Sequence, residues 1–472
     1  MRKAVFGALV GAALATGAVL VPADAYACGG CFGPPPPPSE QPSIVTDHRM
    51  VFSVSQGQTT LYDQIKYTGN PASFAWVLPI VGEVKVGLSS DVMFGVLDRN
   101  TQTTIQAPPL NCPPRPSDCN NRNAFGAAPS ADGSSSGGGT GVDVLKSEVV
   151  GPYETVQLRS TDPNALINWL NENKFVIQED SKPVIAQYVK EHFDFLALKL
   201  APGQNVKSMR PVSITTQGAS PVLPLRMVAA GTGATVGITL WVVAEGRYET
   251  QNFPFFRVET DEIAWDWAAQ KSNYTDLRKA KTDASGGRAW EIESSIALGK
   301  DTLSQQIQYG GGGIGGSSSG GAQPEDFGGY APIKDGQGQV TKTARQVYEE
   351  DMKTLLGSIS GSSIRLTRIR ADLSHAALTE DLVISASKDQ AVLTPYRQLT
   401  KEIGEPLCPV WDGCTQVGTA PRSEAIAKGR QSEDTASFTC KTSPKSSFPS
   451  VLGLGALASF LGLVVVRARK KS

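Results

Sequence analysis

The two ends of the chain constrain it most, because each carries an uncharged hydrophobic segment next to basic residues. Near the N-terminus, Arg2 and Lys3 precede an apolar run over residues 4–21. Near the C-terminus, residues 448–466 contain no charge and approach the roughly 20 residues that a helix needs to cross a bilayer. We therefore expect the central part of the chain to fold outside the cytoplasm.

The N-terminal segment predicts a signal peptide over residues 1–27. Ala25 and Ala27 are the small residues that a signal peptidase recognises, so we expect cleavage between Ala27 and Cys28. A lipoprotein, with Cys28 as its modified first residue, is the weaker alternative. Ala25 and Tyr26 match poorly the residues that usually precede a lipidated cysteine.

The C-terminal segment predicts a single transmembrane helix over residues 448–466. The basic residues that follow it at once form the membrane stop and are expected to stay in the cytoplasm: Arg467, Arg469, Lys470 and Lys471. The tail also resembles the sorting tails of bacterial surface proteins, although no LPxTG-type motif precedes it. Retention and removal of the tail both stay open, and the expected location is the bacterial cell envelope.

Cysteine spacing agrees with an exported chain. Six of the seven cysteines form close pairs, for which we expect local disulfides: Cys28 with Cys31, Cys112 with Cys119, and Cys408 with Cys414. A link between the second and third pairs stays open, because spacing does not determine connectivity. Cys440 is left over, as a candidate for a free thiol, a link to another chain or processing of the tail.

For the Cys28–Cys31 pair, two more specific interpretations are a redox dithiol and a zinc site. The sequence supports each of them less than a structural disulfide. A redox dithiol needs a helix to lower a thiol pKa, whereas Pro34–Pro38 follow here and prolines do not continue a helix. A zinc site needs two further ligands, and the sequence offers no matching CxxC or HxxxH motif. No metal and no cofactor are expected.

Composition shifts divide the chain into successive regions. Between the signal peptide and the membrane span we expect a Cys/Pro-rich linker (28–43), a β-rich N-terminal part (44–108), a disordered Cys/Gly/Ser loop (109–142), an α+β ectodomain (143–308), a Gly/Ser-rich linker (309–340), a C-terminal α+β segment (341–414) and a stalk (415–447). Residues 467–472 are the cytoplasmic tail.

Periodicity within these regions predicts an α+β fold, with largely antiparallel sheets and a few packed helices. Residues 44–80 are expected to form a meander of about four strands, and Phe193–Leu200 and Ile364–Leu373 to form further strands. Helices are expected to begin at Pro163, capped by Thr161 or Asp162, near Ser181, and near Thr343.

The sequence contains no arrangement of residues that is typical of a catalytic site, so no enzyme activity is expected. His48, His192 and His375 share no ligand spacing. Asp47-His48 is interpreted as a solvated strand edge rather than a general base, because no nucleophile motif accompanies it. The chain carries 44 Lys+Arg against 45 Asp+Glu, which argues against nucleic acid as a partner.

Two further clusters receive structural interpretations. Asp261, Glu262 and Asp266 lie beside Trp265 and Trp267; we favour an amphipathic helix or loop anchored by Trp265 over a carbohydrate or calcium site. The arginines that could pair with acids across sheets, rather than hold an anionic ligand, are Arg226, Arg368 and Arg370.

Several motifs in combination resemble a known family. They include Ala27-Cys28-Gly29-Gly30, the segments 74–79 and 161–166, Leu223-Pro224-Leu225-Arg226, and residues 237–241 and 366–370. Over roughly residues 24–390 the chain resembles the bacterial exported proteins grouped as domain of unknown function 2330. That resemblance implies no reaction, ligand or catalytic residue.

The sequence thus predicts an envelope protein with a non-catalytic binding or structural ectodomain. Its expected partners are the membrane and an envelope protein or polysaccharide. An envelope hydrolase that uses paired carboxylates is the alternative, and it requires a pocket with two carboxylates about 5–10 Å apart. Redox activity at Cys28 and Cys31 is a third hypothesis.

Overall fold

The computed structural model describes residues 44–68, 75–115, 144–173, 175, 177, 179–202, 204, 209–219, 221–229, 235–310, 327–334, 338–412 and 414–428. The chain divides into two compact units. The first contains the residues up to Pro109 and from Ala124 to Gly404, and the second contains Leu110–Asn123 and the residues from Glu405 onward. The predicted signal peptide, the Cys28–Cys31 motif, the predicted membrane span and the basic tail lie outside the described residues.

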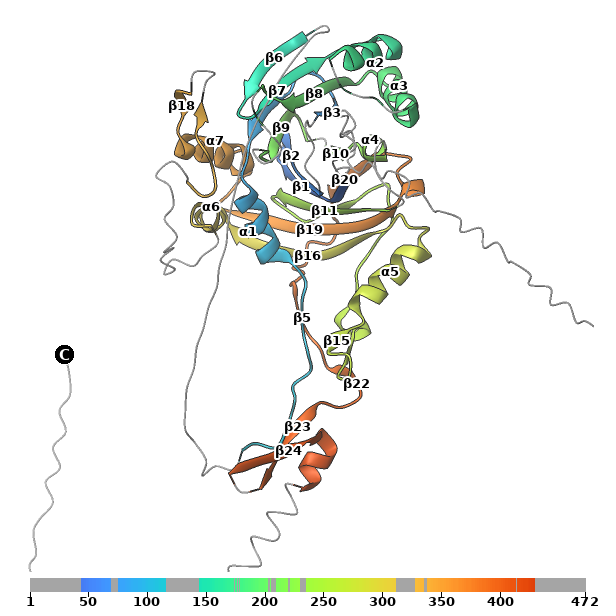
Figure 1. Ribbon diagram of the computed structural model, residues 1–472, viewed down its shortest axis with the longest axis vertical. Helices are drawn as coiled ribbons and strands as arrows, with labels where there is room; N and C mark the ends of the chain where they lie inside the picture. Colours follow the sequence, from blue (N-terminus) through green and yellow to red (C-terminus); the bar gives the residue numbers. More distant parts are fainter. Residues whose placement is uncertain are drawn as a thin grey trace, which may run out of the picture. The chain divides into compact units, whose positions relative to one another are not determined.

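An eight-stranded sheet forms the centre of the first unit (Figure 1). Its order is β13 (Phe255–Phe256), β16 (Trp290–Gly299), β19 (Ser363–Ser374), β11 (Thr235–Ala244), β1 (Ile44–Val54), β2 (Gln58–Thr68), β9 (Val212–Gln217) and β4 (Lys85–Leu88). Neighbours are antiparallel except for β1 with β11 and β13 with β16. The predicted strands 193–200 and 364–373 are confirmed as β8 and β19.

A four-stranded antiparallel sheet packs on one face of this centre. Its order is β3 (Ala75–Ile80), β8 (Asp194–Leu200), β7 (Tyr153–Leu158) and β6 (Val144–Val150). The expected four-strand meander over 44–80 is therefore wrong. β1 and β2 pair in the larger sheet, whereas β3 pairs with β8 in the smaller one.

Three apolar layers hold the two sheets and their helices together. On β11, Leu240 and Val242 point into the core between the sheets, while Trp241 and Val243 point to the opposite face. This alternation follows from the period-two geometry of a strand. The outer face of the four-stranded sheet forms the third layer, beneath Trp169 and Tyr188.

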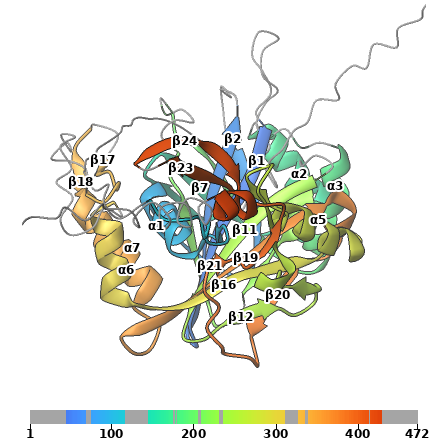
Figure 2. The ribbon, with the colours of Figure 1, turned by 90° about the horizontal axis from the view of Figure 1, so that it is seen from below.

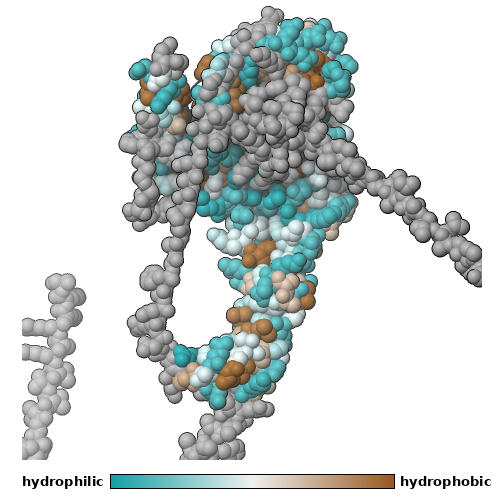
Figure 3. Space-filling view, in the orientation of Figure 1, coloured by the Kyte–Doolittle hydropathy of each residue, from teal (hydrophilic) through white to brown (hydrophobic). Residues whose placement is uncertain are grey.

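Helices cover the outer face of each sheet. On the four-stranded sheet lie α2 (Pro163–Glu172) and α3 (Lys182–Lys190), whose outward surface is largely hydrophilic (Figure 3). On the eight-stranded sheet lie α1 (Asp91–Thr101), α6 (Lys300–Gln308) and α7 (Ala344–Leu356), with α6 and α7 next to each other in Figure 2. Two further helices of the first unit are α4 (Leu225–Ala229) and α5 (Tyr274–Ala284).

Two of the three predicted helix starts are confirmed by their caps, and the third, near Ser181, is confirmed by the start of α3 at Lys182. Asp162 accepts a hydrogen bond from the Asn164 backbone N–H, and Pro163 opens the first turn of α2. Thr343 and Gln346 form a capping box at the start of α7.

Two small three-stranded sheets and two strand pairs also belong to the first unit. They are β10 (Val222–Leu223), β20 (Leu382–Ala386) and β12 (Tyr248–Thr250); β15 (Lys271–Ser272), β14 (Ala264–Asp266) and β22 (Lys401–Ile403); β17 (Ile333–Lys334) with β18 (Val340–Lys342); and β21 (Tyr396–Gln398) with β5 (Thr104–Gln106). The expected separate segment 341–414 is thus mostly part of this unit, because β19 lies between β11 and β16. The expected linker 309–340 also contributes to the core, since Tyr330 is buried.

The second unit contains β23 (Leu407–Asp412) and β24 (Thr415–Pro421), which pair antiparallel. A disulfide between Cys112 and Cys408 joins its two chain segments. The expectation of a stalk over 415–447 is therefore wrong for its first residues, where strand pairing satisfies the backbone hydrogen-bonding groups. Among the described residues, no helix is long and apolar enough to span a membrane.

Candidate functional site

A groove of about 360 Å³ lies where the edges of the two sheets approach each other. β4 is the last strand of the larger sheet, and β6 is the last strand of the smaller one. Residues of α7, β17 and β18 line the groove as well, and Figure 1 shows α7 and β18 on the same side as β6. We call this hollow the edge groove; its volume is in the range of small-ligand sites.

A glycine turn brings the two edges together. Gly151, between β6 and β7, has a φ of +58°, which disfavours any residue with a side chain. A Cβ at this position would also lie 2.3 Å from Cδ1 of Leu88 in β4. Glycine therefore allows the β6–β7 turn to pack directly against β4.

Charged side chains line the edge groove. Lys146 pairs with Glu148 at 3.0 Å, and Lys342 pairs with Glu350 at 2.6 Å. Both pairs are partly or largely exposed, so each contributes little stability and its groups can exchange partners. Lys85 is exposed, and no ion pair involves it in the described part of the chain.

A buried carboxylate lies at the wall of the groove. Oδ2 of Asp351 accepts hydrogen bonds from Ser89 Oγ and from the Tyr330 hydroxyl, each at 2.6 Å. Burial raises the pKa of Asp351 to about 6, although these donors act in the opposite direction. The negative charge of Asp351 adds to burial in raising the pKa of Tyr62. A carboxyl group with such a pKa can hold or release a proton near neutrality.

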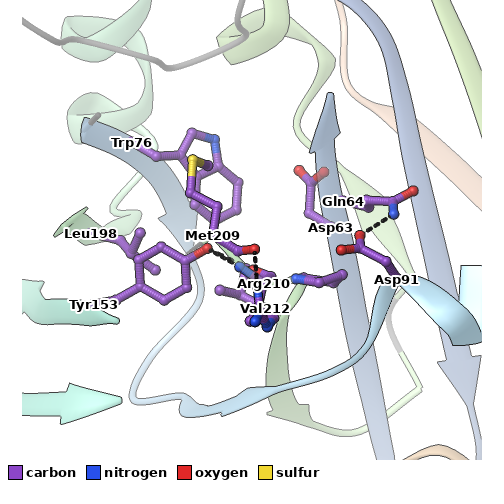
Figure 4. A pocket seen from close by; sticks show the side chains of 10 residues that line it. Asp63, Gln64, Trp76, Asp91, Tyr153, Leu198, Met209, Arg210 and Val212 are labelled. Carbon is purple, nitrogen blue, oxygen red and sulfur yellow. Dashed lines mark hydrogen bonds between the residues drawn. The ribbon is translucent and has the colours of Figure 1, made fainter. Parts of the chain in front are cut away.

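A second, much smaller cavity lies between the two sheets, beside Asp63 (Figure 4). Its volume is about 30 Å³, room for about two water molecules. The hydroxyl of Tyr153 closes one side by donating to the Arg210 carbonyl oxygen and accepting from the Arg210 N–H. Gln64 closes another side, where its amide donates to Asp91 and its carbonyl oxygen accepts from Arg49.

Asp63 is the most perturbed carboxylate at this cavity. It is 3% exposed, and its Oδ1 has no hydrogen-bond partner among the described groups. Burial raises the pKa of Asp63 to about 7. Asp63 and Asp91 thus line one cavity, but its volume admits water and no sugar ring. The chemistry available there is exchange of a proton with water that enters the cavity.

Two further glutamates share one tyrosine. The Tyr274 hydroxyl lies 2.8 Å from Oε1 of Glu291 and 3.4 Å from Oε1 of Glu293. Burial, then the nearby charge of Glu293, raises the pKa of Glu291 to about 6. Arg278 and Arg368 bind these two glutamates in turn. The pair is therefore neutralised inside the protein, and no described cavity opens onto it.

The predicted structural role of the arginines is supported by their contacts. Arg368 pairs with Glu293 and Asp98, with its guanidinium 5.2 Å from the Trp241 ring centre. Arg370 lies 3.8 Å from Asp372.

Arg226, in α4, makes a similar set of contacts. It pairs with Glu191 and Asp381 at 2.7 Å each and stacks on Tyr188. These hydrogen bonds raise the pKa of Arg226 further.

The three histidines lie apart on different elements. His48 is in β1, His192 follows α3 with a φ of +64°, and His375 begins a short 3₁₀ helix, His375–Ala377. Across the described residues, no group of three potential metal ligands occurs. The interpretation of His48 as a solvated edge is wrong, because β1 pairs on both sides and His48 is 1% exposed. Burial lowers the pKa of His48 to about 4.

The acidic and aromatic cluster forms no helix over its whole length. Thr260–Glu262 form a 3₁₀ turn, and Ala264–Asp266 form β14. The better-buried anchor is Trp267 rather than Trp265, and its indole N–H donates to Glu402 Oε2 at 2.7 Å.

The cysteine pairing corrects one expectation. Cys112 is bonded to Cys408, so the expected local pairs Cys112–Cys119 and Cys408–Cys414 are wrong, and the open alternative of a link between the two pairs is found. Cys414 is also disulfide-bonded. Local spacing failed because β23 brings Cys408 to the segment that follows Pro109. Cys28, Cys31, Cys119 and Cys440 lie outside the described residues.

The fold is that of a mixed α+β protein with two stacked, mostly antiparallel sheets. The chain belongs to the family described as uncharacterized protein conserved in bacteria (DUF2330), whose model matches residues 22–291, more than half of the chain. The match confirms the resemblance that the motifs suggested, over a shorter stretch than residues 24–390. No curated protein and no solved structure matches the chain.

Proposed function

We propose that this protein is an exported bacterial envelope protein, membrane-anchored or surface-sorted, with a non-catalytic ectodomain that binds its partner in the edge groove. The groove carries the proposal, because its volume of about 360 Å³ suits a ligand and charged side chains line it. The predicted signal peptide and the basic C-terminal stop support export. The Cys112–Cys408 disulfide fits an oxidising compartment.

Intact mass tests the location. The protein would be taken from native envelope fractions and weighed with and without reductant. A mass that begins at Cys28 and rises by about two hydrogens per reduced disulfide supports export. A mass that still includes residues 1–27, in a cytoplasmic fraction, contradicts it.

Photo-crosslinking tests the binding role. A photo-reactive residue at position 148, whose side chain faces the groove, should capture an envelope protein or polysaccharide in living cells. The matched control carries the same group at Asp261, which is exposed and does not line the groove. Equal products from the two positions would contradict a binding role for the groove.

The buried carboxyl group of Asp351 supports a second candidate function, that of an envelope hydrolase that uses paired carboxylates. Its raised pKa suits a general acid, and Glu148 and Glu350 line the same groove. This function predicts cleavage of envelope polysaccharide that Asp351→Asn abolishes and Glu349→Gln leaves intact. Purified protein with no such cleavage would rule the candidate out.

A further inference from the structure

We propose that the edge groove binds an extended peptide segment that adds a strand to the free edge of β6 and places an acidic side chain near Lys85. The inference rests on the proposed binding function and names the class of ligand. Strand addition draws affinity from backbone hydrogen bonds and specificity from alternate side chains.

The free edge of β6 follows from the sheet order. In the described part of the chain, β6 pairs with β7 alone. Val150 and Tyr153 close the two-residue turn between these strands, and such a closing pair exchanges hydrogen bonds. Alternation then directs the backbone N–H and C=O of Ser147 and Val149 away from β7.

The backbone of this edge is regular and accessible. Val149 is 65% exposed, and no proline or recorded bulge interrupts Lys146–Val150. The register irregularity of β6 lies before Lys146. An added strand therefore finds a regular, accessible edge of about five residues.

Side-chain alternation directs part of the ligand into the groove. Val150 packs against the core between the sheets, so Lys146 and Glu148 point to that same face of the smaller sheet. Every second side chain of an added strand would point the same way. These ligand side chains would meet the polar lining of the edge groove.

Charge selects the ligand side chain. Lys146 and Lys342 already have the acidic partners Glu148 and Glu350. The ammonium group of Lys85 has no ion-pair partner in the described structure. A carboxylate of the ligand can therefore form an ion pair with it. An acidic residue at a groove-facing position is therefore favoured over a basic one.

Peptide enrichment tests the inference on the full-length protein in detergent micelles. The probe is a pool of eight-residue peptides in which β-branched residues alternate with random ones. We expect at least tenfold enrichment of peptides with Asp or Glu at one random position. No enrichment, or enrichment of basic peptides, overturns the inference.

Two variants assign the enrichment to the groove. Ser147→Pro removes an outward N–H that strand addition uses, and an edge strand tolerates proline at such a position; Ser147→Ala is its control. Lys85→Glu reverses the selecting charge, and Lys271→Glu, outside the groove, is its control. Enrichment that survives both Ser147→Pro and Lys85→Glu overturns the inference.

Hydrogen exchange excludes an occupant from the same chain. The amides of Ser147 and Val149 should exchange fast in the free protein and slow when the enriched peptide binds. Slow exchange without peptide would mean that another segment of the chain fills the edge, which overturns the inference. If position 148 crosslinks a polysaccharide while no peptide is enriched, the binding function stands and the peptide class falls.

Discussion

Cys112 and Cys408 are bonded although 296 residues separate them. The first unit already brings the flanking chain together, because Gln106 pairs with Gln398 in the β5–β21 strand pair. The disulfide therefore closes an effective loop of roughly 15 residues, worth about 3 kcal/mol in the chain-entropy account. It stabilises the second unit rather than the first.

Replacing both cysteines should loosen the second unit alone. In the variant Cys112→Ala/Cys408→Ala, we expect faster proteolysis within residues 405–428 and an unchanged melting temperature for the first unit. Limited proteolysis with mass spectrometry and a thermal melt measure the two effects. Identical cleavage rates in the variant and the parent would contradict the assignment.

Sequence periodicity predicted the elements whose signal is local. Asp162 and Thr343 cap the helices where their side-chain chemistry indicated, and β19 follows its alternation. The pairing of β3 with β8 could not be predicted, because residues more than 100 positions apart form it. α1 escaped notice too, although Ser90 caps it and Asp91 opens it.

The candidate sites were harder to predict, because each contains a polar residue in an apolar pattern. Asp63 occupies the strand face that Leu61 shares, and Asp351 lies on the stripe of Val347 and Leu355 in α7. The available signal in the sequence was a carboxylate at a position where the apolar pattern predicts burial. The groove itself depends on two sheet edges from distant segments, which periodicity does not bring together.

Asp63 should make stability fall as pH rises. The pKa of its carboxyl is about 7 in the folded protein, against 3.8 for an aspartate in water. The folded state therefore holds a proton that the unfolded state releases between these values. The stabilisation is complete below about pH 4 and is lost as pH rises through 7, and a shift of about three units corresponds to roughly 4 kcal/mol.

Asp63→Asn should flatten this dependence. We expect urea unfolding between pH 4 and 8 to show a smaller loss of stability in the variant than in the parent. Asp351 and Glu291 leave a residual slope, because burial raises the pKa of each to about 6. The exposed Asp261→Asn is the control; an equal slope in Asp63→Asn and Asp261→Asn would contradict a buried, protonated Asp63.

His48 should make stability fall as pH decreases, which is the opposite of the effect of Asp63. Its pKa is lowered from 6.5 to about 4, so the unfolded state binds a proton that the folded state does not hold. Stability from this group is lost as pH falls from 6.5 to 4. Both ring nitrogens lack a described hydrogen-bond partner, so His48→Leu also removes two unpaired polar atoms.

His48→Leu should therefore be more stable than the parent by about 1 kcal/mol near neutral pH, and by more at pH 5. Urea unfolding at both values measures the difference. The exposed His192→Gln is not a neutral control, because His192 has a positive φ; His375→Gln is preferable. A variant that is less stable than the parent at pH 5 would show that His48 has a partner.

Arg278 neutralises the most deeply buried carboxylate of the glutamate pair. Its Nε lies 2.6 Å from Glu291 Oε2, and its Nη2 lies 2.9 Å from Asp372 Oδ2. The Glu291 side chain is 0% exposed, so removal of the arginine leaves a charge with little access to water. Arg278→Met should cost about 3–5 kcal/mol of unfolding free energy.

A double-mutant cycle separates this charge effect from lost packing. Adding Glu291→Gln to Arg278→Met should restore at least half of the loss, because the unpaired charge is gone. Lys279→Ala, which breaks the exposed pair with Asp283, should stay within about 0.5 kcal/mol of the parent. If the double variant is as unstable as both single losses added together, Arg278 and Glu291 are uncoupled, and Arg278 stabilises the sheet through its contacts with α5 rather than through the glutamate.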